Sequence, residues 1–112
     1  MSPAELDAAC RALPGATMTV QWGDEEVYKV GGRMFAVTSP RRHLSLKVSD
    51  IAFEALIETG RARAAPYLAR AKWVLFDDIS ELDAEETRDW LKTAHTLVAA
   101  KLTRAQRAEI GL

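Results

Sequence analysis

The residues that could perform acid–base, nucleophilic or metal chemistry are few and far apart. Two histidines, His43 and His95, lie on a predicted strand and a predicted helix, without the H-x-x-x-H or H-x-x-E spacing of a metal site. Cys10 falls on an apolar helical stripe, where a small buried thiol is expected rather than a nucleophile. We therefore expect no catalytic site, no metal site and no cofactor, and we predict that the chain is not an enzyme.

Carboxylates are dense between residues 77 and 89, which raises the question of a metal cluster. Asp83, Glu85 and Glu86 belong to the first turn of a predicted helix, where anionic side chains complement the helix dipole. This segment is therefore interpreted as the start of a helix.

Basic and acidic side chains are separated along the chain, although the chain has 15 Lys and Arg against 16 Asp and Glu, a net charge of −1. Residues 40–72 hold seven basic and three acidic residues, and residues 73–91 hold seven acidic residues and one basic residue. Such blocks can be ordinary solvated faces. Alternatively, the basic block converges on folding into a surface that binds anions.

The second interpretation identifies candidate contacts to nucleic acid. Lys47 lies on the polar face of its strand, and Lys29 shares that face if the register permits. An aromatic plane beside positive charge, as in the segment 67–72, is the pairing that stacks bases and holds phosphates. Two arginines lie at a predicted hairpin tip. The candidates are Lys29, Arg41, Arg42, Lys47, Tyr67, Arg70 and Lys72.

Hydrophobic periodicity predicts the elements that position these residues. Ser2 and Glu5 form a capping box, and Gly31-Gly32 is a two-residue hairpin loop. Leu44, Leu46 and Val48 alternate with polar residues, and both Trp22 and Trp73 are assigned to the core or its rim. The predicted helices are 3–13, 49–59 and 84–102, the predicted strands are 17–22, 26–30, 33–39, 43–48 and 72–76, and residues 103–112 are a short separate turn or a frayed end.

This order, α-β-β-β-β-α-β-α, predicts an α+β two-layer sandwich, an antiparallel sheet with helices on one face. The 112 residues are expected to form a single domain, 1–112. No apolar run reaches the roughly 18 residues of a membrane span, and no signal-peptide pattern opens the chain, so a cytoplasmic location is expected.

Several sequence blocks together resemble a known family. The most specific is VYKVGGRMFA at residues 27–36, accompanied by L-P-G at 13–15, W-G at 22–23, LSLK at 44–47 and PYLARAKWV at 66–74. These blocks resemble the MmcQ/YjbR family of small bacterial proteins. Many relatives have Asn-Lys and a His before the tryptophan, where this chain has Arg70-Ala71-Lys72. The resemblance implies a frataxin-like or secretion-chaperone-like α/β fold and a DNA-binding role through a double-wing arrangement.

Two hypotheses follow. In the first, the chain is a non-enzymatic domain that binds DNA through its central basic surface. In the second, it is a chaperone-like interaction module that presents a face or an edge of its sheet to a protein partner. We favour the first, because the resemblance and the basic block agree.

Overall fold

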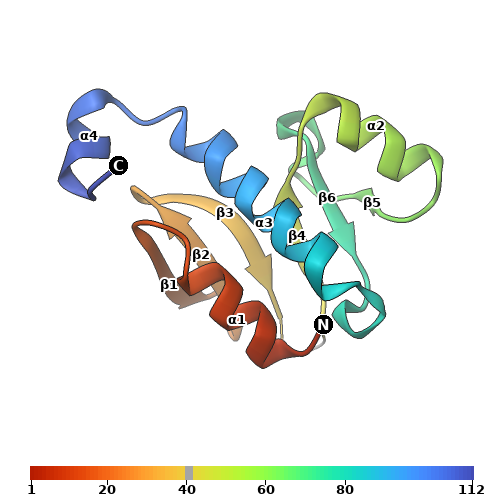
Figure 1. Ribbon diagram of the computed structural model, residues 1–112. Coiled ribbons are helices and arrows are strands. Elements are labelled where there is room, and N and C mark those ends of the chain that lie inside the picture. The colour runs from red at the N-terminus through yellow and green to blue at the C-terminus, as the bar shows by residue number, and fades with distance from the viewer. Residues whose placement is uncertain (40–41) are drawn as a thin grey trace.

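The computed structural model describes residues 1–39 and 42–112. These residues form a six-stranded antiparallel sheet of β1 (Ala16–Gln21), β2 (Glu25–Val30), β3 (Arg33–Thr38), β4 (Leu44–Lys47), β5 (Arg63–Ala64) and β6 (Trp73–Phe76). The strand order is β1-β2-β3-β4-β6-β5, so the first four strands form the predicted meander and β6 adds to its far side (Figure 1). The predicted α+β class is confirmed.

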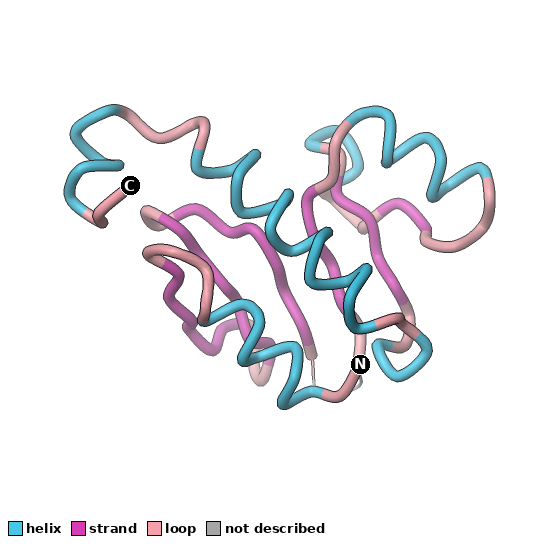
Figure 2. Tube along the Cα trace, viewed as in Figure 1, coloured by secondary structure: helices cyan, strands magenta, loops and turns pink. Residues whose placement is uncertain are grey.

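Three helices, α1 (Pro3–Arg11), α2 (Asp50–Glu58) and α3 (Ala84–Ala99), lie on one face of this sheet (Figure 2). Each begins at a side chain that accepts a hydrogen bond from the first helical turn: Ser2 in a complete capping box, Ser49, and Asp83. The acidic residues after Asp83 therefore belong to a helix start, as the sequence indicates. In the described part of the chain no helix is long and apolar enough to cross a membrane.

The main core lies between the sheet and these helices, and Phe35 is at its centre. Phe35 is fully buried, with its ring 5.5 Å from that of His95 in an edge-to-face arrangement. The Nε2 atom of His95 lies 2.7 Å from the carbonyl oxygen of Pro14. Cys10 is also fully buried, and burial raises the pKa of its thiol to about 12. His95 and Cys10 are therefore structural residues, as predicted.

The alternation predicted for β3 is wrong at its centre. Phe35 and Ala36 are both buried against the helices, because the register with β2 shifts between Tyr28 and Lys29 and inserts one extra residue into β3. Such a bulge turns two successive side chains to the same side.

Other differences occur at the sheet edges and the C-terminal end. The segment 61–66, which lies outside the predicted helices and strands, contains the two-residue edge strand β5. Val20, in the predicted strand 17–22, is 59% exposed, because β1 is an edge strand where fewer neighbours are available to cover it. Residues 104–109 form a separate short helix, α4 (Arg104–Glu109), which begins with a capping box at Thr103.

Candidate nucleic-acid interface

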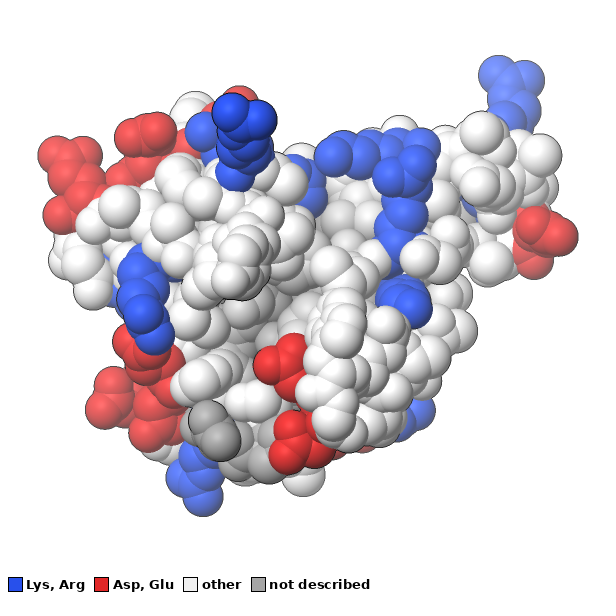
Figure 3. All heavy atoms as spheres, turned by 180° about the vertical axis from the view of Figure 1, so that it is seen from behind, with Lys and Arg blue, Asp and Glu red and all other residues white. Residues whose placement is uncertain are grey.

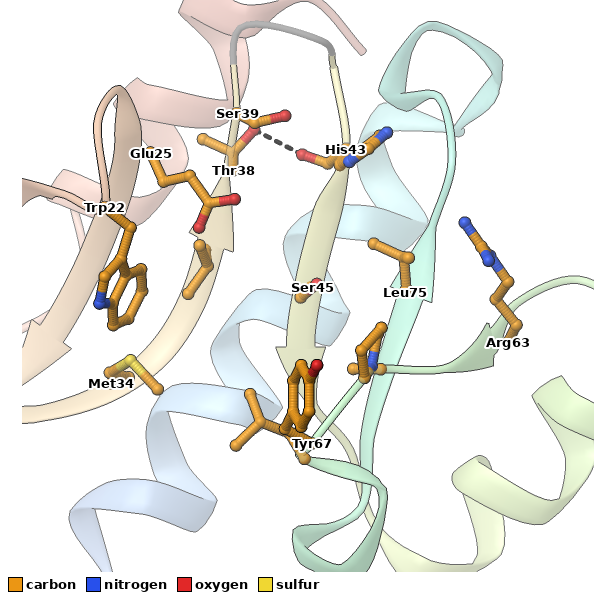
Figure 4. Close-up of a pocket in the computed structure, with 14 residues that line it drawn as sticks. Trp22, Glu25, Met34, Thr38, Ser39, His43, Ser45, Arg63, Tyr67 and Leu75 are labelled. Carbon is orange, nitrogen blue, oxygen red and sulfur yellow. Dashed lines mark hydrogen bonds between the residues drawn. The ribbon is translucent and has the colours of Figure 1, made fainter.

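The face of the sheet opposite α1, α2 and α3 is left open and contains a hollow of about 620 Å³. Its floor is a second, smaller apolar cluster in which Ala65, Trp73 and Leu75 are buried and partly buried side chains pack around them. Trp73 is therefore a core residue, as predicted, but of this second cluster. The residues that line the hollow are Trp22, Glu25, Met34, Val37, Thr38, Ser39, His43, Ser45, Arg63, Ala65, Pro66, Tyr67, Leu68 and Leu75 (Figure 4).

Two aromatic side chains reach the hollow from opposite edges of the sheet. Trp22 lies in the turn between β1 and β2, and Tyr67 lies between β5 and the 3₁₀ helix Ala69–Ala71 (Figure 4). Trp22 is 63% exposed and Tyr67 is completely exposed. Leaving a large apolar ring in water costs free energy. Core packing therefore does not explain the exposed positions of Trp22 and Tyr67.

Both aromatic residues also have a left-handed backbone, with φ of 51° at Trp22 and 67° at Tyr67. This conformation costs about 1–2 kcal/mol for a residue with a Cβ. Among the described residues, Arg42 and Lys72 are the other non-glycine positions with positive φ. Trp22 and Tyr67 are thus both strained and exposed, a combination that is characteristic of functional sites.

The cross-strand register brings Lys29 and Lys47 onto the open face at the same end of the sheet. Lys29 pairs with Met34, whose side chain packs on the floor cluster, and Lys47 pairs with Trp73 of that cluster. The two lysines are two strands apart, about 10 Å. The predicted sharing of a face by Lys29 and Lys47 therefore agrees with the register.

Further cations gather at this end of the sheet. The ammonium of Lys47 donates a hydrogen bond to the carbonyl oxygen of Ala71, between Arg70 and Lys72. Burial lowers the pKa of Lys47, and the positive charges of Lys101 and Lys72 lower it further, although Asp50 opposes them. Hence we use the name lysine end for the group Lys29, Lys47, Arg70, Lys72 and Lys101.

Three other basic residues of the 40–72 block, Arg42, Arg61 and Arg63, are not part of the lysine end. Arg42 lies at the other end of β4, five residues or roughly 16 Å from Lys47 along the chain. There, the backbone N–H of Ile79 donates a hydrogen bond to the carbonyl oxygen of Arg42. Arg61 and Arg63 form ion pairs with Glu86 (2.6 Å) and Asp77 (2.7 Å).

The described residues of the basic block therefore do not lie together on one surface: Lys47, Arg70 and Lys72 are at the lysine end, whereas Arg42, Arg61 and Arg63 are not. Arg42 lies at the end of the sheet that also carries carboxylates such as Asp78. The hydrogen bonds that Asp78 accepts from Ser80 lower the pKa of its carboxyl, and the charge of Arg42 adds a smaller effect. Arg41 lies outside the described residues.

Charge divides the open face into a basic and an acidic part. Figure 3 shows this face, with a mostly uncharged hollow in the middle, Lys and Arg atoms mainly along the upper border, and Asp and Glu atoms on the left and below. Glu25 is the acidic residue that lines the hollow. A bound anion is therefore favoured at the lysine end and disfavoured near Glu25.

A histidine and a carboxylate both line the hollow, so we considered an acid–base pair. His43 comes from the start of β4, and Glu25 from the start of β2. In Figure 4 the ring of His43 points away from the carboxylate of Glu25, and Thr38 lies between them, donating a hydrogen bond of 2.7 Å to the carbonyl oxygen of His43. Their arrangement does not have the geometry that general acid–base catalysis requires.

Sequence reasoning missed two members of this interface. Trp22 was assigned to the core or its rim, because it continues the alternation of Met18 and Val20; it is instead an exposed residue of the adjoining turn. Lys101 lies outside the basic block and reaches the lysine end only because α3 returns across the sheet. The dipeptide Trp22-Gly23 was a usable signal, since a bulky aromatic residue directly before a turn glycine has few neighbours in the chain to cover it.

Comparison with known proteins shows which family the chain resembles. The family model YjbR matches residues 11–97. The crystal structure of Deinococcus radiodurans protein DR2400, with a domain of the family model DUF419, superposes with a TM-score of 0.82 at 30% sequence identity, covering 96% of this chain and 86% of that one. The comparison with curated proteins gives no match.

Proposed function

The chain belongs to the YjbR family, and from this premise we propose that it is a non-enzymatic domain that binds DNA through the open face of its sheet. The observation that supports the proposal is that the face free of helices carries exposed aromatic rings and, at one end, Lys29 and Lys47, with the charges of Lys72 and Lys101 close to Lys47 at that same end. Sheet faces with aromatic platforms beside cations are a recurrent solution for binding nucleic acid.

The cations of the lysine end take part in none of the ion pairs found among the described residues, which involve Arg11, Arg61, Arg63 and Arg88. Lys47 instead donates to the carbonyl oxygen of Ala71, and the ammonium of Lys72 lies 4.9 Å from the centre of the Phe53 ring. Burial and, less strongly, the charges of Lys101 and Lys72 destabilise the charged form of Lys47, so a phosphate placed beside it would stabilise that form. Anion binding at the lysine end therefore does not require an existing ion pair to be broken.

The test is a titration of the protein with DNA at several salt concentrations. If the five residues of the lysine end each neutralise a phosphate, the logarithm of affinity falls with the logarithm of salt concentration at a slope of roughly −3.5 for a single strand and −4.5 for a duplex. A slope near zero, or no binding at low salt, would contradict the proposal.

A matched pair of variants localises the contact. The double substitution Lys72→Ala with Lys101→Ala removes two cations of the lysine end and is expected to bring the slope closer to zero by about 1.4–1.8. Lys92→Ala removes an exposed lysine of α3 on the helical side, so it is expected to leave the slope unchanged. Equal effects of the two changes would indicate diffuse attraction rather than a defined surface.

A protein partner is the second candidate, and the apolar lining of the hollow favours it. An apolar segment of another chain would bury this lining, and its affinity would depend weakly on salt. Purification from native extract separates the candidates: a stoichiometric polypeptide supports the partner hypothesis, and co-purifying nucleic acid supports DNA binding.

A further inference from the structure

We propose that the hollow receives unpaired bases of single-stranded DNA, which stack on Trp22 and Tyr67 at its two sides, while the adjacent phosphates lie at the lysine end. The inference rests on the proposed function and goes further, since it specifies the form of DNA and the part of it that enters the hollow. Four observations support it.

The first observation is the aromatic pair itself. A base in a duplex has its two faces covered by neighbouring bases, so exposed protein rings can stack only on a base that has left the stack or was never in one. Trp22 and Tyr67 both line the hollow, Trp22 from the side of β1 and β2 and Tyr67 from the side of β5 and β6 (Figure 4). Two rings that face a common space suit a flat, apolar guest.

The second observation is the size and lining of the hollow. Its volume of about 620 Å³ lies within the range of sites that enclose small organic groups. Met34 and Val37 of β3 and Leu75 of β6, the two strands that flank β4, provide apolar contact. Ser45 and His43 provide polar atoms at the same level, which can hydrogen-bond the edge of a base.

The third observation is the direction of the charge. Glu25 lines the hollow, whereas Lys29 and Lys47 lie on the same face toward the other end of the sheet. The phosphate of a nucleotide is therefore attracted away from Glu25, and its uncharged base is directed toward the hollow. Glu25 and Lys29 are four residues apart on β2, about 13 Å, a distance that a strand of a few nucleotides can span.

The fourth observation is the apolar floor, which favours thymine among the bases. Thymine carries a methyl group that the floor of Met34, Val37 and Leu75 can contact, and uracil lacks it. The preferred probe is therefore oligothymidylate.

The experiment compares a labelled ten-residue oligothymidylate with a blunt hairpin duplex and with oligouridylate of the same length. Binding is followed by fluorescence anisotropy and by tryptophan fluorescence, which base stacking quenches. We expect oligothymidylate to bind most tightly and to quench. Trp22→Ala and Tyr67→Leu are each expected to weaken its binding by roughly 5- to 150-fold, the measured range for loss of one stacking partner.

Conservative variants distinguish stacking from general effects. Trp22→Phe and Tyr67→Phe keep a ring and are expected to restore most of the affinity, and Trp22→Phe also abolishes the quenching that Trp22 contributes. Val20→Ala is the control, because Val20 is similarly exposed at 59% but precedes Trp22 by two residues on β1 and does not line the hollow. It should bind like the original protein.

The outcomes separate this inference from the proposed function. Failure of every probe to bind at low salt overturns both. The inference alone is overturned if the duplex binds as tightly as oligothymidylate and Trp22→Ala has no effect, while the double variant of Lys72 and Lys101 binds more weakly. DNA binding itself would then stand. Preference for oligouridylate overturns the assignment to DNA.

Discussion

The two faces of the sheet are built from the same strands, yet they differ in how completely their apolar side chains are covered. On the helical face, Phe35, Leu46 and Val74 are completely buried. On the open face, Trp73 and Leu75 are buried, but Trp22 and Tyr67 extend into solvent. The strain differs as well, because both of these exposed aromatic residues have a left-handed backbone.

This difference separates the face that stabilises the fold from the face on which we propose that DNA binds. Apolar area removed from water stabilises the fold in proportion to its burial, so the helical face dominates the free energy of unfolding. Exposed rings and unpaired cations contribute little to that free energy. Substitutions on the helical face should therefore change stability, and those on the open face should change affinity.

The largest expected effect is that of Phe35→Ala. Phe35 is fully buried and contacts His95 edge-to-face, so its truncation is expected to lower the free energy of unfolding by about 3–5 kcal/mol. Urea denaturation followed by circular dichroism measures the change.

The neighbouring Met34 is the matched control for this comparison, because it is partly buried on the open face. Met34→Ala should cost less than half as much. If the two substitutions cost the same, the open face is as important for stability as the helical one, and the contrast between the faces is lost.

A smaller loss is expected from Gly31→Ala at the β2–β3 hairpin. A Cβ at Gly31 would lie 2.7 Å from two atoms of the buried Leu102 side chain, and the residue has φ of +57°. Overpacking and backbone strain together are expected to cost about 2–4 kcal/mol. Thermal and urea unfolding both report this loss.

Gly32 provides the control within the same hairpin. Its φ is +79°, but a Cβ there would have no atom within 4 Å, so Gly32→Ala should cost only the conformational strain, about 1–2 kcal/mol. Equal losses would mean that Leu102 moves aside freely and that the helical face is not packed at the hairpin.

A third prediction concerns a hydrogen bond of the helical face. The Tyr28 hydroxyl donates to Oδ1 of Asp7 (2.6 Å), and this bond is the main reason that the pKa of Asp7 lies below its ordinary value of 3.8. Tyr28→Phe is expected to lower the free energy of unfolding by about 1 kcal/mol at pH 7, a modest value because Asp7 is partly in water.

The same substitution has a defined pH dependence. A lowered pKa in the folded state stabilises the fold above pH 3.8, and this contribution is lost as the pH falls through the lowered value. The difference between the original protein and the variant should therefore shrink below about pH 4. The control Tyr67→Phe, which removes an exposed hydroxyl, should not change the free energy of unfolding at any pH. If the stability difference between the original protein and Tyr28→Phe persists in acid, the interaction with Asp7 is not its cause.

The predictability of the fold from sequence follows the same division. The helical face was predictable, because buried positions impose periodicity on the sequence: Leu44, Leu46 and Val48 alternate, and capping residues open the helices. The bulge at Phe35 was not predictable, since a shift of register depends on how the partner strand pairs rather than on the residue itself.

The open face was predictable only in part. Lys47, Arg70 and Lys72 are close in sequence or paired through adjacent strands, so their grouping followed from the local pattern. Lys101 joins them from 29 residues beyond Lys72, and Arg61 and Arg63 are neutralised by carboxylates of other segments. Long-range ion pairing leaves no local mark in one sequence, so a charge count over a block cannot identify which cations stay free.

The smallest expected effect, from Trp22→Gly, is also the sharpest test of the contrast between the faces. Glycine relieves the strain of the left-handed backbone at φ of 51°, a gain of about 1–2 kcal/mol. Against this gain, glycine loses more chain entropy on folding, about 0.5–1 kcal/mol, and the few contacts of a ring that is 63% exposed are removed. The free energy of unfolding should therefore stay the same or rise by up to about 1 kcal/mol, as measured by urea denaturation. Trp22→Ala retains the strain and should be slightly less stable than Trp22→Gly. A loss of 2 kcal/mol or more would place Trp22 among the residues that hold the fold together, and its exposure would then need no ligand to explain it.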